Sequence, residues 1–202
     1  MTICFYIHRY YNAMNPVLEN INTRVSVREY TQEKVPEETV RELLKAGFRG
    51  PNAMNRQALA FAVVENKEKA KEYSDRAKEL RIDGEKMKCD PNQHVIDMLS
   101  REDYNIFFNS PVQIFIFASP EAVEPVEDGS IAAENIMLAA HSMGLGTCYV
   151  GFAQGLGRDT GFRKDLGVPD DYTYLAAITL GRPSGTTPVK PRKEVPVLGW
   201  IR

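Results

Sequence analysis

Residues 23–36 read "TRVSVREYTQEKVP", so two arginines and a serine stand at alternate positions ahead of a proline. In an extended backbone, side chains two residues apart point to the same face, which gathers Arg24, Ser26 and Arg28 on one side. The two intervening valines would then point inward. Such a polar face is either a solvated edge or a binding site for an anion.

The three polar side chains are chemically suited to a phosphate group. Arginine binds phosphate through paired N–H donors, and serine adds a hydroxyl donor. The alternative is that the arginines face water and pair with Glu29 or Glu33. Taken alone, the segment favours the solvated edge, so the rest of the chain must decide between the two.

Composition narrows the class of protein. The 202 residues carry 25 basic and 27 acidic side chains, a net charge of -2, which predicts no general affinity for nucleic acid or membrane. No apolar run approaches the roughly 20 residues that span a bilayer. Three widely spaced cysteines fit reduced thiols in a cytoplasm, and without a paired-cysteine motif we expect no structural zinc. We therefore expect a soluble, cytoplasmic, globular protein.

The opening "MTICFYIHRYYNAMN" has an apolar patch but lacks a basic start and a small-residue cleavage site, so no secretory signal is expected. Met14 could itself be a start. We expect residues 1–13 to be an N-terminal extension and residues 14–202 to form one domain.

Hydrophobic periodicity predicts a mixture of helices and strands. One helix starts at Pro36, with Val40, Leu43, Leu44 and Gly47 on one stripe, and ends at Gly50-Pro51. Further helices are predicted at 66–81, as an amphipathic surface helix broken before Gly84, within 82–104 after a loop, at 129–143 and at 158–169. Strands are predicted at 59–65, 112–118, 147–152 and 172–181, followed by an extended tail at 182–202. This mixture indicates an α/β or α+β fold.

The helix at 129–143 is apolar nearly all round, with alanines that permit close backbone approach at 132, 133, 139 and 140. Such a helix is buried on several sides. We expect it to lie between a sheet and a partner chain, with Gly144 ending it.

Three further segments each have two interpretations. In "GPNAMNRQA" (50–58) the side-chain amides could bind a heterocycle or form an ordinary turn. "GLGTCYVGF" (144–152) enters a strand from a helix, the reverse of a dinucleotide fingerprint, so its glycines suit a tight turn or a flat ligand. "KPRK" (190–193) is a second basic cluster or a solvated tail.

In combination and order, these segments resemble the nitroreductase family of FMN-dependent α+β homodimers. The resemblance rests on the Arg-x-Ser-x-Arg segment, the "VPEE" helix start, the turn at 50–58, the Val-Val strand and the two C-terminal sections "SIAAENIMLAAHSMGLGTCYVG" and "LGVPDDYTYLAAITLGRP". It covers roughly residues 16–195. It implies a three-layer fold, with a central mixed, mainly antiparallel sheet flanked by helices.

The resemblance assigns roles to particular residues. It implies that residues from both ends of the polypeptide bind the phosphate and ribityl group of FMN. These residues are Arg24, Val25, Ser26, Arg28, Lys190 and Arg192.

For the flavin ring, the resemblance places Tyr149, Val150 and Gly151 along the isoalloxazine. Asn52 and Asn55 would reach the flavin from the other subunit, so that each site straddles the dimer interface. Asn52 itself departs from the family's small hydroxyl residue.

The resemblance implies an oxidoreductase that uses NADH or NADPH to reduce nitroaromatics, quinones or similar acceptors by a ping-pong mechanism. The alternatives are a specialised member, such as a reductive dehalogenase or flavin-consuming synthase, and a non-catalytic flavin sensor or store. A specialised member needs substrate-clamping residues, for which Glu72, Tyr73 and Lys78 are candidates, although we expect them on the surface of a charged helix. The segment 66–104 matches no subfamily.

Overall fold

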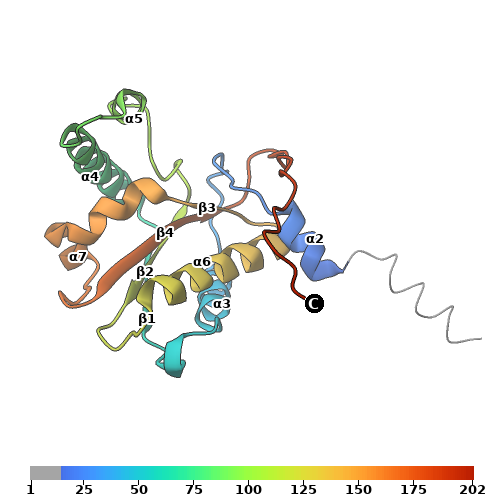
Figure 1. Ribbon diagram of the computed structural model, residues 1–202. Helices are drawn as coiled ribbons and strands as arrows, with labels where there is room; N and C mark the ends of the chain where they lie inside the picture. Colours follow the sequence, from blue (N-terminus) through green and yellow to red (C-terminus); the bar gives the residue numbers. More distant parts are fainter. Residues whose placement is uncertain (1–14) are drawn as a thin grey trace, which may run out of the picture.

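The computed structural model describes residues 15–202, so the predicted extension at 1–13 lies outside the described residues. A four-stranded sheet forms the middle of the molecule, in the order β1-β2-β4-β3 and with every neighbouring pair antiparallel (Figure 1). Its strands are β1 (Leu59–Val64), β2 (Val112–Ala118), β3 (Gly146–Tyr149) and β4 (Thr173–Gly181).

One parallel contact extends the sheet beyond β3. Ser26 forms an isolated parallel bridge with Thr147, and the backbone N–H of Val27 donates to the carbonyl of Thr147 at 2.9 Å. The predicted mixed, mainly antiparallel sheet is therefore confirmed, and the segment with the alternating arginines lies along its edge.

Helices cover both faces of the sheet (Figure 1). On one face lie α3 (Glu37–Phe48) and α6 (Pro125–Ser142), and on the other lie α4 (Lys67–Lys86), the 3-10 helix η2 (Gly151–Arg158) and α7 (Thr160–Asp165). The smaller elements are α2 (Pro16–Thr23) beside the end of α6, η1 (Ala53–Asn55) before β1, and α5 (Gln93–Leu99) against α4. The three-layer prediction is thus confirmed.

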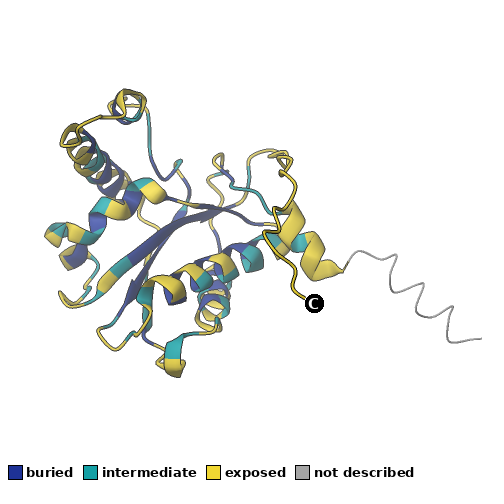
Figure 2. Ribbon diagram, viewed as in Figure 1, coloured by how far each residue is buried: buried dark blue, intermediate teal, exposed yellow. Residues whose placement is uncertain are grey.

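The alternation of β2 creates a core on each side of the sheet. Every residue of β2 is buried. Ile114 and Ile116 pack in the cluster with α3 and α6, while Phe115 and Phe117 pack in the cluster with α4, η2 and α7. Because both faces are covered by helices, the strand is buried along its whole length (Figure 2), and all of its residues except Gln113 are apolar.

Helix α6 is buried against the sheet and against α3, as its composition predicted. Ala132, Ala133 and Ala140 are almost inaccessible, and the Asn135 side chain donates to the Ala46 carbonyl of α3 at 3.3 Å. The helix begins at Pro125, earlier than predicted, and ends before Gly144, whose φ of +72° suits a residue without a side chain.

Several predicted boundaries were wrong. Helix α4 continues through Gly84 to Lys86, because local ion pairs offset the low helix propensity of one glycine: the buried Glu85 carboxylate contacts Arg81 at 2.5 Å and Lys88 at 2.7 Å. Pro36 is the N-cap of α3 instead of its first residue. The strand predicted at 147–152 ends at Tyr149, and η2 begins at Gly151.

Two residues expected on the surface of the α4 helix are buried. Tyr73 packs among aromatic rings and its hydroxyl contacts Asp165 at 3.3 Å. Lys78 donates to the carbonyls of Arg101 and Tyr104, both at 3.0 Å, and so holds the following loop against α4. Leu80, on the same helix, is exposed.

Among the described residues, no helix is long and apolar enough to cross a membrane. Within residues 15–202 no group of three or more histidine, cysteine or acidic side chains is arranged to hold a metal ion.

Candidate functional site at the sheet edge

A cavity of about 460 Å³ lies between α2, residues 24–28, α6 and the C-terminal segment. It brings together all six residues predicted to hold a phosphate and its attached chain, although they come from opposite ends of the sequence. Its lining includes Arg24, Val25, Ser26, Arg28, Lys190 and Arg192.

The edge segment is held by its neighbours. Gly146 lies so close to Val27 that a Cβ on it would stand 2.7 Å from a Val27 methyl group. The Tyr30 hydroxyl lies 2.7 Å from the Val27 carbonyl and donates to it. Val27 points inward as predicted, but Val25 was wrongly assigned to the interior, because it lines the cavity beside the arginines.

Positive charge dominates the cavity. Arg24 Nε lies 3.5 Å from Glu134 Oε1 of α6. Within the described part of the chain, no carboxylate lies within ion-pair distance of Arg28, Lys190 or Arg192. Glu33 pairs with Arg182 at 3.0 Å and not with the two predicted arginines. A cavity with three uncompensated cations favours an anionic ligand.

Beside this cavity, the Cys148 thiol is buried. Burial raises the pKa of the Cys148 thiol, although the charges of Arg28 and Arg24 act in the opposite direction. A neutral buried thiol has little reactivity. The guanidinium of Arg28 lies over the ring of Phe108, 5.7 Å from its centre, which orients it at the site.

The turn after β3 carries the residues predicted to lie along a flavin ring. The N–H of Val150 donates to the Ala177 carbonyl at 2.9 Å, so this turn is fixed to β4. Gly151 is the first residue of η2, a position whose N–H has no intrahelical partner. Tyr149 is 41% exposed, and its hydroxyl donates to the Leu175 carbonyl at 3.4 Å.

Asn52 and Asn55 do not line the 460 Å³ cavity. They lie in the turn around η1, at the far end of α3 from α2 (Figure 1). The Asn52 side chain accepts from the Gln57 N–H at 2.9 Å, and Met54, Asn55 and Gln57 all have positive φ. Their predicted approach to the flavin of a second subunit stays a prediction.

Two acidic residues of α6 were missed by sequence reasoning. Asp128 is buried and accepts from the Ala53 N–H at 3.0 Å, which holds the strained turn at η1. Glu134 pairs with Arg24 inside the cavity. Asp128 carried a signal in the sequence, since an acidic residue buried in a largely apolar helix requires a partner, whereas the half-exposed Glu134 carried none.

The fold and the site together define a class: an α+β protein with a cation-lined cavity of about 460 Å³ at the edge of an antiparallel sheet. Comparison with known proteins identifies the family. The sequence model described as Nitroreductase family matches residues 21–182, and the chain belongs to that family.

Individual relatives agree with this assignment. A protein of Methanothermobacter thermautotrophicus, which carries the provisional name NADH dehydrogenase/NAD(P)H nitroreductase, is 31% identical over 83% of this chain and 78% of its own length. The NADPH-flavin oxidoreductase of Vibrio harveyi is 28% identical over 89% of this chain and 70% of its own. A nitroreductase with bound FMN from Bacteroides fragilis superimposes with a TM-score of 0.78 at 26% identity, covering 93% of this chain and 99% of that one. The predicted family and fold are thereby confirmed.

Proposed function

We propose that the protein is an FMN-dependent oxidoreductase that uses NADH or NADPH to reduce nitroaromatics, quinones or similar acceptors. The observation that carries this proposal is the cavity in which Arg28, Lys190 and Arg192 lack carboxylate partners among the described residues. A dianionic phosphate supplies the missing negative charge, and Ser26 adds a hydroxyl donor.

The donor set fits FMN beyond its phosphate. The cavity is long enough to reach from the arginines of the edge segment to the basic tail, and the turn at Tyr149 to Gly151 continues the edge strand next to it. The free N–H at the start of η2 can donate to a ring nitrogen or carbonyl. Bound FMN would supply the hydride-accepting and electron-donating chemistry.

The names of the relatives support the same activity. Those names include an NADPH-flavin oxidoreductase and FMN reductases, and solved nitroreductases with 25–26% identity contain FMN. The chain needs no acid, base or nucleophile of its own for this chemistry, which agrees with the inert Cys148.

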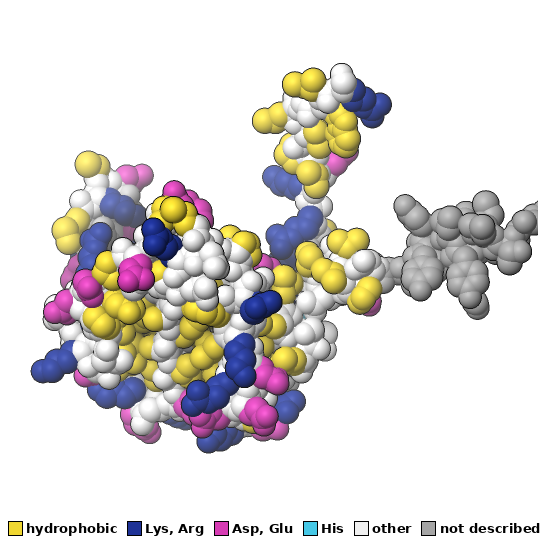
Figure 3. Space-filling model, turned by 90° about the horizontal axis from the view of Figure 1, so that it is seen from below, with side chains coloured by type: hydrophobic (Ala, Val, Ile, Leu, Met, Phe, Trp, Pro, Cys, Tyr) yellow, Lys and Arg dark blue, Asp and Glu magenta, His cyan; other side chains and the backbone are white. Residues whose placement is uncertain are grey.

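The protein is proposed to act as a homodimer with FMN at the subunit interface. The C-terminal segment projects from the body with hydrophobic side chains in solvent, including the fully exposed Leu198 and Ile201 (Figure 3). The neighbouring α2 exposes Val17 and Leu18. Exposed apolar side chains gathered in one region of the molecule are typical of an interface, and a second copy of the chain would cover them.

Nicotinamide and acceptor are proposed to use one site in turn. Each must bring its reacting atom within roughly 3–3.5 Å of the same ring, and one cleft cannot hold both there. The steps would be two half-reactions, with the oxidised nicotinamide leaving before the acceptor enters.

The alternative of a specialised enzyme with a zwitterion clamp finds less support. Lys78 is already bound to two backbone carbonyls, and the Tyr73 hydroxyl contacts Asp165. Neither group is free to bind a substrate.

Initial rates test the proposal. The purified protein, reconstituted with FMN, should oxidise NADH or NADPH with menadione or nitrofurazone as acceptor and give parallel double-reciprocal lines. Intersecting lines would rule out the shared site. FMN binding without turnover would identify a sensor or store. Failure to bind FMN would refute the proposal that the protein is FMN-dependent.

A further inference from the structure

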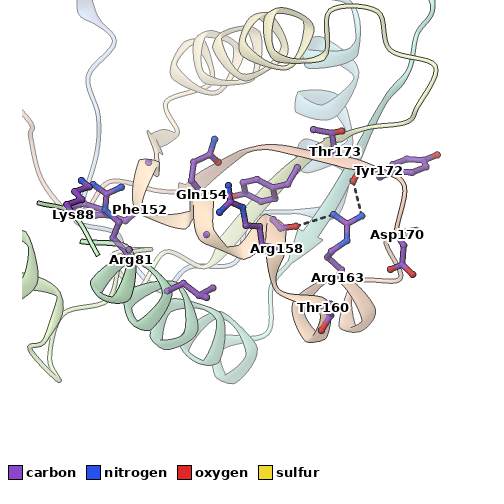
Figure 4. Close-up of a pocket in the computed structure, with 16 residues that line it drawn as sticks. Arg81, Lys88, Phe152, Gln154, Arg158, Thr160, Arg163, Asp170, Tyr172 and Thr173 are labelled. Carbon is purple, nitrogen blue, oxygen red and sulfur yellow. Dashed lines mark hydrogen bonds between the residues drawn. The ribbon is translucent and has the colours of Figure 1, made fainter. Parts of the chain in front are cut away.

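A second, larger groove of about 870 Å³ lies along η2 and shares no lining residue with the 460 Å³ cavity. It runs between the C-terminal half of α4, η2 and the start of β4 (Figure 4). Gly151 and Phe152 line it, so it begins at the turn proposed to lie along the flavin ring. The groove therefore adjoins the position proposed for the flavin ring, where a nicotinamide ring must arrive.

The groove is rich in cations. It is lined by Arg81, Lys88, Arg158 and Arg163, and Asp170 is the one carboxylate among its lining residues. In Figure 4, Arg158 lies between Arg81 and Lys88 on one side and Arg163 on the other.

The carboxylates paired with these cations do not neutralise all of their positive charge. Arg81 and Lys88 share a single carboxylate, that of Glu85, at 2.5 and 2.7 Å. Arg158 is exposed and has no ion-pair or hydrogen-bond partner in residues 15–202. The positive charges of Arg81 and Lys88 are thus compensated by the single carboxylate of Glu85, and the charge of Arg158 is compensated by none.

Arg163 is the most unusual of the four. Its side chain is buried, and its guanidinium donates only to backbone carbonyls, to Gly157 at 3.3 Å, to Tyr172 at 2.8 Å and to Pro169. No carboxylate of the described chain pairs with it. A buried cation without a counter-ion is costly, and an anion in the groove next to it offsets that cost.

Arg81 contacts the opposite side of the groove. The guanidinium of Arg81 lies 5.9 Å from the ring centre of Phe152, which links α4 to η2. The Nε of Arg81 is buried and has no hydrogen-bond partner among the described residues. An unpartnered buried donor beside a cationic groove is a further group that an anion would satisfy.

We propose that this groove binds the pyrophosphate of the nicotinamide dinucleotide donor, with Arg158 as its main ligand. The inference rests on the proposed function and extends it by naming the donor's binding surface. A volume of about 870 Å³ lies within the range of small-molecule sites and exceeds what a quinone needs. Since NADH and NADPH share the pyrophosphate, the groove contributes to binding of both.

The test compares Arg158→Ala and Arg158→Glu with Lys164→Ala, an exposed cation of the neighbouring α7 that does not line the groove. The KM for NADH and NADPH should rise about tenfold in Arg158→Ala, the loss expected for one charge-assisted hydrogen bond, and further in Arg158→Glu. FMN content, the KM for menadione and the control variant should not change. Inorganic pyrophosphate should inhibit the natural protein competitively against NADPH, and Arg158→Glu should be insensitive to it.

The outcomes separate the two proposals. If the natural protein oxidises neither nicotinamide, the proposed function fails, whatever Arg158 does. If it turns over normally but both Arg158 variants keep the natural KM for the donor and pyrophosphate does not compete, the groove is not the donor's site. A rise in the KM for the acceptor alone would assign the groove to the acceptor and overturn the inference.

Discussion

Replacing Arg24 with alanine is expected to weaken FMN binding, and the structure predicts that part of the loss comes from a neighbour. The Arg24 side chain is only 17% exposed and lies 3.5 Å from Glu134, which shares the same cavity. The arginine is therefore proposed to have two roles. It would donate to the phosphate, and it would neutralise a carboxylate that otherwise repels that phosphate.

The magnitude follows from these two contributions. A hydrogen bond to a charged group contributes about 1.5–3 kcal/mol, which corresponds to about a 10- to 150-fold rise in Kd. Glu134 is half-exposed, so solvent screens its repulsion to below about 1 kcal/mol. The double variant Arg24→Ala, Glu134→Gln should consequently recover about two- to fivefold of the lost affinity.

The assay is titration of FMN into apoprotein, followed by flavin fluorescence, for the natural chain, both single variants and the double variant. Arg41→Ala is the matched control, because Arg41 is an exposed arginine paired with Glu37 on α3, outside the cavity. Natural affinity in Arg24→Ala would refute the phosphate assignment. A double variant no better than Arg24→Ala would refute the role of Glu134 and leave the phosphate contact standing.

Three further results are expected. Gly146→Ala should lower the free energy of unfolding by about 1–3 kcal/mol in urea, because the new Cβ meets Val27 at 2.7 Å, and an unchanged midpoint would contradict this. In the folded protein iodoacetamide at pH 8 should label the exposed Cys89 well before Cys148, whose pKa burial raises, and equal labelling in peptide mass maps would be the contrary result. Light scattering should find a dimer for the full chain and a shift toward monomer when residues 195–202 are removed, whereas an unchanged dimer would show that this segment is not part of the interface.

The sequence alone determined the local features. β2 at Val112–Ala118 was predicted at its observed bounds, since a strand covered on both faces is a nearly continuous apolar run, here interrupted only by Gln113. The alternating arginines, the basic tail and the glycine-spaced turn identified the family, because their types and order carry that information without any contact being known. The roles of Asn52 and Asn55 stay untested.

Only the tertiary structure decided how distant segments meet. Residues 24–28 and Lys190 share one cavity because the sheet edge, α6 and the C-terminal segment converge there, which no local periodicity specifies. The pairing of Glu134 with Arg24 likewise depends on a long-range contact. The cationic groove beside η2 has the same origin: its four cations lie on α4, η2 and α7 or in the turn joining α4 to α5, and each reads in the sequence as an ordinary surface charge until packing brings them together. The pattern of side chains along the sequence predicts local secondary structure. The burial of a charged side chain without a counter-ion arises only when separate helices and strands pack together.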